Sequence, residues 1–149
     1  MISNYSNLVY LHDLIESIVE HDVTFVISLL QARIGDGWTR RITGVVYAGK
    51  EERLPNGKRI DVLYKVKNFD KVICLGFEIK TGNSIEENQL TEELEGLSRV
   101  EGCDARYLVL VAPNDPKFDV PYYFIPFTEF LPRVKTVIKL IEKLQFIAR

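Results

Sequence analysis

Residues 73–82, ICLGFEIKTG, carry the pattern that decides the fold of this chain. An apolar run leads to Glu78 and Lys80, and the turn-prone pair Thr81-Gly82 follows. Side chains alternate across a β-strand, so a strand over residues 71–80 places Glu78 and Lys80 on one face, with space beside them at Gly76. The opposite face is apolar and holds Ile73, Leu75, Phe77 and Ile79.

The segments before this strand predict a meander of three strands. Residues 40–48 and 59–66 have strand character, and LPNG at 54–57 lies between them. Asn-Gly after proline is a strong hairpin signal. A second short connection at residues 68–70 then leads into the third strand.

Asp61 is the acidic residue of the second strand. Ile60, Val62, Tyr64 and Val66 form the apolar face of that strand, so Asp61 lies on the opposite face, and the simplest pairing puts it beside Glu78. Two adjacent carboxylates repel unless a proton or cation intervenes. Oxygen ligands suit Mg²⁺ or Mn²⁺, and a neighbouring lysine can serve the attacking water or stabilise charge on phosphate oxygens. This set is what metal-dependent hydrolysis of a phosphodiester needs. The alternative is that Glu78 and Lys80 are an ordinary pair at a strand end and Asp61 a surface residue after a turn.

The remaining segments predict an α/β fold. Apolar residues recur at helical spacing over residues 7–20, and a second apolar stretch follows a break near Asp22 and ends before GDG at 35–37. Ser84 and Glu87 predict a capping box for a helix that ends near Gly102. The chain then continues with a buried strand over residues 106–112, an edge strand within 122–127 that contains Pro126, and a helix over 131–147.

Ile60-Asp61, Glu78-Ile79-Lys80, Thr81-Gly82 and Gln89, in this order, resemble the PD-(D/E)XK nuclease superfamily, nearest to its RecB-like branch. Glu93 stands where that branch has a tyrosine. The resemblance implies a restriction-endonuclease-like core of helix, three-strand meander, helix and strand in a mixed sheet flanked by helices. One domain over residues 1–149 is expected, with its core at about 8–112 and an appended strand and helix at about 121–149.

The resemblance also implies roles for the site residues. Asp61 and Glu78 would hold Mg²⁺ or Mn²⁺ together with the backbone carbonyl of Ile79, and Lys80 would serve the attacking water. Many members of the superfamily add an acid from the first helix, for which Glu16 and Glu20 are the candidates.

Helical spacing favours Glu16, which borders the apolar stripe of its helix, over Glu20, which faces further toward solvent. His12, one turn before Glu16, is interpreted as a residue that flanks the core. Gln89 borders the stripe of the next helix. It either reaches Lys80 or a phosphate, or is a surface amide.

Charge along the chain is uneven and indicates where a nucleic acid, expected to be DNA, could lie, unless these are ordinary solvated charges on exposed turns. Residues 33–71 hold ten Lys and Arg against five Asp and Glu, whereas residues 86–104 hold seven acids against one arginine. A polyphosphate would favour the basic region. The residues expected to contact nucleic acid are Arg40, Arg41, Lys58, Arg59 and Lys65.

The last helix carries an apolar stripe with basic flanks. It either packs on the domain or pairs with a second copy, as would suit a nuclease that cuts both strands of a duplex. A homodimer through the C-terminal helix is the expectation.

Composition points to a soluble cytoplasmic protein with no membrane partner. The net charge of 149 residues is −2, no apolar run approaches the roughly 20 residues of a membrane span, and a signal-peptide pattern is missing from the N-terminus. Cys74 and Cys103 have no disulfide-framework or metal-ligand spacing and are expected to be small buried apolar residues.

Two alternatives to a nuclease remain. The chain could be a catalytically inactive nuclease-like module that binds nucleic acid or protein, consistent with its low net charge and with Glu93 in place of the tyrosine. It could also be an unrelated α/β domain with carboxylates in a chance arrangement. Metal binding that depends on Glu78 separates the first alternative from a nuclease, and the separation of Asp61 from Glu78 tests the second.

Overall fold

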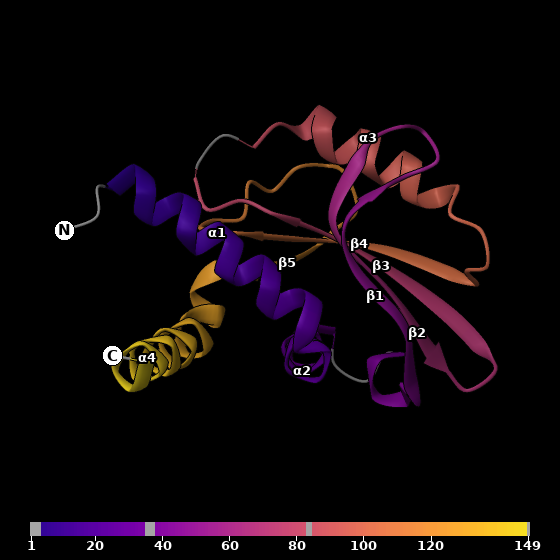
Figure 1. Cartoon of the computed structure of the whole chain (residues 1–149). Coiled ribbons are helices and arrows are strands. Elements are labelled where there is room, and N and C mark those ends of the chain that lie inside the picture. The colour runs from indigo at the N-terminus through magenta and orange to yellow at the C-terminus, as the bar shows by residue number, and fades with distance from the viewer. Residues whose placement is uncertain (1–3, 35–37, 83–84, 149) are drawn as a thin grey trace.

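The computed structural model describes residues 4–34, 38–82 and 85–148, and shows an α/β fold with helices on both faces of one mixed sheet (Figure 1). The GDG stretch at 35–37 and Ser84 lie outside the described residues. The helices are α1 (Asn4–His21), α2 (Val23–Ile34), α3 (Glu87–Ser98) and α4 (Leu131–Ala148), with 3₁₀ turns η1 (Trp38–Arg41) and η2 (Phe127–Phe130). The strands are β1 (Gly44–Arg53), β2 (Arg59–Asn68), β3 (Lys71–Ile79), β4 (Ala105–Ala112) and β5 (Tyr123–Pro126).

The five strands lie in the sheet in chain order, β1-β2-β3-β4-β5. The first three form an antiparallel meander, and β4 and β5 add to it in parallel. A parallel neighbour needs a crossover connection, which α3 supplies between β3 and β4. The predicted order of elements is therefore confirmed, as is the position of the proline-containing strand β5 at the edge of the sheet.

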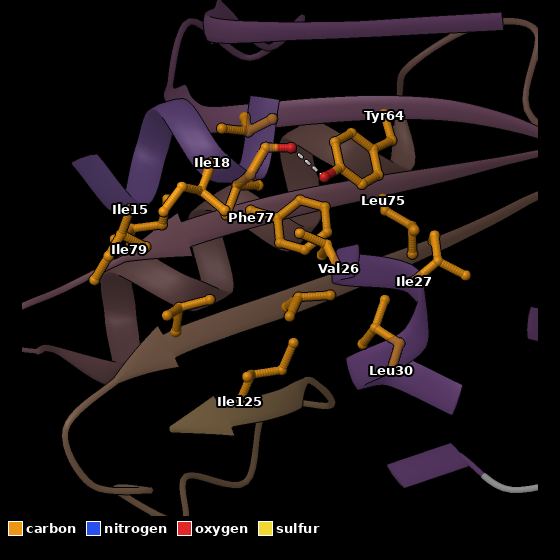
Figure 2. Close-up of a cluster of buried hydrophobic side chains, with 14 of the residues drawn as sticks. Ile15, Ile18, Val26, Ile27, Leu30, Tyr64, Leu75, Phe77, Ile79 and Ile125 are labelled. Carbon is orange, nitrogen blue, oxygen red and sulfur yellow. Dashed lines mark hydrogen bonds between the residues drawn. The ribbon is translucent and has the colours of Figure 1, made fainter. Parts of the chain in front are cut away.

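Each face of the sheet has its own core. Helices α1, α2 and α4 cover one face, and α3 covers the other (Figure 1). The larger core joins Ile15 and Val26 of the helices to Tyr64 and Phe77 of the sheet, and the Tyr64 hydroxyl donates a hydrogen bond to the carbonyl of Val19 (Figure 2). This bond ties the end of α1 to the centre of β2.

Several predicted boundaries were wrong. The first strand begins at Gly44 rather than residue 40, because residues 38–41 form a 3₁₀ turn, and it runs on to Arg53. Its polar second half is extended because it pairs with β2, with Arg53 opposite Arg59. Helix α3 begins at Glu87 with Glu86 as its N-cap, two residues after the predicted N-cap Ser84, and it ends at Ser98 rather than near Gly102.

Strict alternation predicted that Ile60 and Val62 share a face, and this was wrong. Ile60 packs in the core under α3, whereas Val62, Tyr64 and Val66 face α1 and α2. The space expected beside Gly76 is also filled, since a Cβ at this position would meet Ile60 Cγ1 and Leu97 Cδ2 at 3.3 Å. The glycine thus lets β2 and α3 approach β3 closely.

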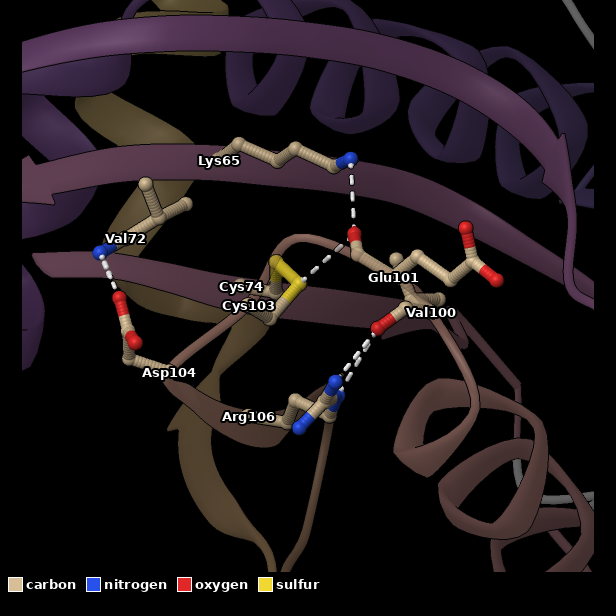
Figure 3. The surroundings of a disulfide bond; sticks show 8 residues. All are labelled: Lys65, Val72, Cys74, Val100, Glu101, Cys103, Asp104 and Arg106. Carbon is tan, nitrogen blue, oxygen red and sulfur yellow. Dashed lines mark hydrogen bonds between the residues drawn. A yellow bond between two sulfur atoms is a disulfide. The ribbon is translucent and has the colours of Figure 1, made fainter.

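The two cysteines form a disulfide, and the expectation of two unpaired residues was wrong. Cys74 of β3 is buried and bonds to Cys103, 29 residues later in the loop between α3 and β4 (Figure 3). Around this bond, Lys65 Nζ donates to the carbonyl of Glu101, and Arg106 donates to the carbonyl of Val100. Spacing along the chain failed to reveal the pair because the parallel strand pairing brings the two segments together.

Helix α4 leaves part of its apolar surface uncovered. Val134, near its start, is buried, whereas Leu140, Leu144 and Ile147 are exposed. In the part of the chain that the structure describes, no helix combines the length and the apolar character needed to cross a membrane.

Candidate metal site

The candidate site lies where β2 and β3 separate. Their ladder ends at the pair Val62 and Phe77. One residue beyond it, Asp61 Oδ2 accepts a hydrogen bond of 2.7 Å from the backbone N–H of Ile79. A side-chain carboxylate thus takes the place of a strand partner, and it holds Asp61 against the end of β3.

Helix α1 brings two further side chains to Asp61. His12 and Glu16 are one helical turn apart and so lie on the same side of the helix. One possible ligand atom from each of His12, Glu16 and Asp61 lies within 4.8 Å of the other two. His12 Nε2 is 3.9 Å from Asp61 Oδ2, and His12 Nδ1 is 4.0 Å from Glu16 Oε2. We call these three residues the His12–Glu16–Asp61 group.

The backbone carbonyl of Ile79 belongs to the same place, because it accepts a hydrogen bond of 3.0 Å from His12 Nε2. The expected metal ligands Glu16, Asp61 and Ile79 O therefore lie together, with an imidazole among them. Glu20, the other helix candidate, pairs with His21 at 2.9 Å instead.

The electrostatics of this group favour a positive charge. Glu16 is only 6% exposed, and burial raises the pKa of its carboxyl, which the charge of Asp61 raises further. The Asp61 carboxylate in turn raises the pKa of His12, against the opposing effect of burial. The raised pKa of Glu16 disfavours a second negative charge beside Asp61, and the raised pKa of His12 favours its cationic form.

Glu78 lies on the α3 side, in a second acidic arrangement. It is buried, and burial together with the carboxyl of Glu93, which is also buried, raises the pKa of the Glu78 carboxyl. Gln89 Nε2 donates to Glu93 Oε1 at 3.2 Å, and Lys80 Nζ is 3.6 Å from Glu78 Oε1. We call Glu78 and Glu93 the Glu78–Glu93 pair.

Asp61 and Glu78 were predicted to lie side by side, and the charge of Asp61 contributes to raising the pKa of the Glu78 carboxyl. Glu78 is not one of the three residues of the His12–Glu16–Asp61 group, and Glu93 also acts on its carboxyl. The placement of Glu78 beside Asp61 stays a prediction.

Sequence reasoning missed two residues of this region. His12 was assigned to the flank of the core, although its spacing of four from Glu16 is the helical signal for a shared face. Glu93 was noted only as a replacement for a tyrosine. Its position three residues after Leu90 and four before Leu97, on the apolar stripe, could have revealed a buried carboxylate.

The residues expected to contact nucleic acid are mostly at the surface. Arg41 and Arg59 are exposed, while Lys58 Nζ pairs with Glu92 Oε2 at 2.7 Å. The Arg40 side chain lies outside the described part of the structure. Lys65 lines a groove of about 690 Å³ beside the β1–β2 hairpin, together with Arg53, Arg99 and Tyr47.

Comparisons of the chain with models of protein families, with curated proteins and with solved structures found no match. The function is therefore inferred from the side chains of the site and their placement.

The donor set suits a hard divalent cation. Carboxylate and carbonyl oxygens are the ligands that Mg²⁺ and Mn²⁺ prefer, and the imidazole of His12 adds a nitrogen that favours Mn²⁺ over Mg²⁺. The buried carboxylates of this region also lack enough positive partners of their own. Among the described residues, His12 and Lys50 act on Glu16, and Lys80 acts on Glu78 and Glu93.

Proposed function

We propose that this protein is a metal-dependent nuclease of the PD-(D/E)XK superfamily, nearest to the RecB-like branch, that hydrolyses phosphodiester bonds in DNA. The observation that carries the proposal is the convergence of Glu16, Asp61 and the Ile79 carbonyl at the end of β3. Lys80 lies two residues after Glu78 and contacts it. These are the residue types that hydrolysis of a phosphodiester requires.

Some of these residues would bind the ion, and Lys80 would act on the water or the substrate. His12, Glu16, Asp61 and the Ile79 carbonyl would hold the cation, with Glu78 facing it from the α3 side. A bound divalent ion would supply a more acidic water and neutralise charge on the phosphate. Lys80, half-buried beside Glu78, is placed to donate hydrogen bonds to the attacking water or to a phosphate oxygen, and so to stabilise charge that develops during the reaction.

Arginine and lysine side chains near the β1–β2 hairpin would guide the DNA. Arg59 is two residues from Asp61, and the groove lined by Arg53, Lys65 and Arg99 runs between this hairpin and the end of α3. Contacts of this kind are electrostatic, so DNA affinity is expected to fall as salt concentration rises. The Lys58–Glu92 ion pair would have to open for Lys58 to take part.

The test is cleavage of labelled DNA in Mg²⁺ or Mn²⁺. We expect cleavage by the wild type that stops with a chelator and falls at least ~100-fold in Asp61→Asn. Asp104→Asn is the matched control, because Asp104 Oδ2 also accepts a backbone N–H of β3, that of Val72 at 2.8 Å, but at the opposite end of the strand.

Three outcomes distinguish a nuclease from an inactive binding module. Loss of cleavage in Asp61→Asn but not Asp104→Asn supports the proposal. Salt-sensitive DNA binding without cleavage in either metal, measured by fluorescence anisotropy, supports the inactive binding module instead. Cleavage that survives in Asp61→Asn overturns the assignment of the site.

A further inference from the structure

A pocket of about 380 Å³ lies between α2, η1 and the start of β1. Apolar side chains such as Ile27 and Ile42 line it together with hydroxyl and amide side chains such as Ser28, Gln31 and Thr39. Among the described residues that line this pocket, none is charged. Pockets of this size bind small molecules through an apolar lining and a few placed polar groups. The lining therefore suits an uncharged molecule that has both an apolar and a hydrogen-bonding part.

Thr39 carries a hydroxyl that the fold itself does not use. The residue is 1% exposed, and its Oγ1 is buried without a hydrogen-bond partner among the described residues. Most buried polar atoms have a partner, so an exception points to a partner from outside the chain. Rotation about the Cα–Cβ bond moves a side-chain hydroxyl between staggered positions. The Thr39 hydroxyl can therefore turn toward a molecule in the pocket that this residue lines.

Two contacts hold the polar side of the pocket in place. Gln31 Nε2 donates to the backbone carbonyl of Thr39 at 3.0 Å, and Trp38 stacks on Tyr107 of β4 with 5.1 Å between the ring centroids. Because Nε2 of Gln31 is taken by that carbonyl, Oε1 is the part of the amide that remains for a ligand. The pocket thus offers one acceptor and one hydroxyl that can donate, both on a fixed frame.

We propose that this pocket binds an uncharged nucleobase that carries a ring N–H next to a C=O. The N–H would donate to Gln31 Oε1 and the C=O would accept from the Thr39 hydroxyl, while the ring packs on Ile27 and Ile42. Thymine has this edge, and its methyl group suits the apolar part of the lining. The shared chemistry is the base, which both a free nucleoside and a single strand of DNA carry.

The pocket is separate from the candidate metal site. Gly44, at the pocket, pairs with Lys67 at the far end of β2, whereas Asp61 lies near the beginning of that strand. The rise of a strand places these two ends roughly 20 Å apart. Binding of a base in this pocket therefore does not depend on the proposed nuclease activity or on a bound ion.

The test is a titration of the full chain with thymidine in a chelator, followed by the backbone amide signals in NMR spectra. We expect saturable shifts in α2, η1 and the start of β1. Thr39→Val keeps the shape of the side chain and should weaken thymidine binding about 3–10-fold, as for the loss of one neutral hydrogen bond. Thymidine methylated at its ring N–H should bind the wild type more weakly by a similar factor. Thr91→Val removes an exposed hydroxyl from α3 and is the matched control, with wild-type affinity expected.

A single-stranded oligothymidine separates the two sources of the base. Shifts of the same signals by the oligonucleotide assign the pocket to a base of a bound strand, and shifts by thymidine alone assign it to a free nucleoside. No shift of these signals with either probe at millimolar concentration overturns the proposal, as does binding that Thr39→Val and the methylated thymidine leave unchanged.

A second variant covers the case in which Thr39→Val does not fold. Ser28→Phe places a ring in the pocket from an exposed position on α2 and should abolish the shifts. Wild-type binding by this variant would overturn the proposal as well. Because the titrations contain no divalent ion, a negative result leaves the nuclease proposal standing.

Discussion

Asp61 has a structural partner as well as its proposed ligand role. Its Oδ2 accepts the backbone N–H of Ile79, a residue that is 1% exposed. Loss of this acceptor leaves a buried donor without a partner, which costs about 1–3 kcal/mol. Alanine at position 61 would therefore change stability and the proposed metal binding together, and only a substitution that keeps the acceptor can separate the two effects.

We predict that Asp61→Ala lowers the free energy of unfolding by about 1–3 kcal/mol, whereas Asp61→Asn leaves it within about 0.5 kcal/mol of the wild type. The asparagine carbonyl can still accept from Ile79 and removes a charge near Glu16 and Glu78. Urea unfolding in a chelator measures both variants. Equal destabilisation by alanine and asparagine would show that the charge, not the hydrogen bond, matters for stability.

The residues of the site were predictable to different degrees. Asp61, Glu78 and Lys80 stand out because they are polar groups in apolar strands, and Glu16 because it borders a helical stripe. Ile60 was assigned to the wrong face because strict alternation fails beyond Val62, where the β2–β3 ladder ends although β1 still pairs with β2. Where a strand leaves its partner depends on tertiary packing, which the sequence alone does not display.

A disulfide bond links the two ends of the crossover from β3 through α3 to β4. Cys74 and Cys103 join the start of β3 to the loop that precedes β4, across a separation of 29 residues. A cross-link of this length restricts the unfolded chain and stabilises the fold by about 3–4 kcal/mol in the loop-entropy description. The bond therefore acts on the element that carries Gln89 and Glu93.

We predict that the double variant Cys74→Ala/Cys103→Ser loses about 3–4 kcal/mol of unfolding free energy relative to the oxidised wild type. Urea unfolding with and without reductant measures this. The reductant should destabilise the wild type by a similar amount and leave the double variant unchanged. Two free thiols in the non-reduced wild type, counted by mass spectrometry after alkylation, would contradict the prediction.

At the level of elements, local patterns were enough for most of the fold. The hairpin at LPNG, the buried strand β4 and the edge strand β5 follow from turn chemistry and from runs of apolar residues. The second half of β1 escaped prediction because residues 49–53, GKEER, have little strand preference and are held extended by pairing with β2.

Within the described part of the chain, the second half of α4 has an apolar surface that no other element covers. Helix α4 packs on α1 through its first half, and Figure 1 shows it extending from the side of the sheet that α1 and α2 cover. Leu140 and Leu144 are 57% and 58% exposed, and Ile147 is 77% exposed. These residues follow each other at helical spacing, so together they form a continuous stripe on one side of the helix.

A second copy of the chain is the occupant we predict for this stripe, because a two-fold contact lets each α4 cover the other with the same residues. Light scattering on a size-exclusion column should give a dimer for the wild type at micromolar concentration and a monomer for Leu140→Gln/Leu144→Gln. The control Lys139→Gln/Lys143→Gln changes exposed neighbours on the same turns and keeps the apolar side chains, so it should remain a dimer. A monomeric wild type, or a leucine variant that still dimerises, would exclude α4 as the contact. The expectation that a dimer presents two sites to the two strands of a duplex would then be lost as well.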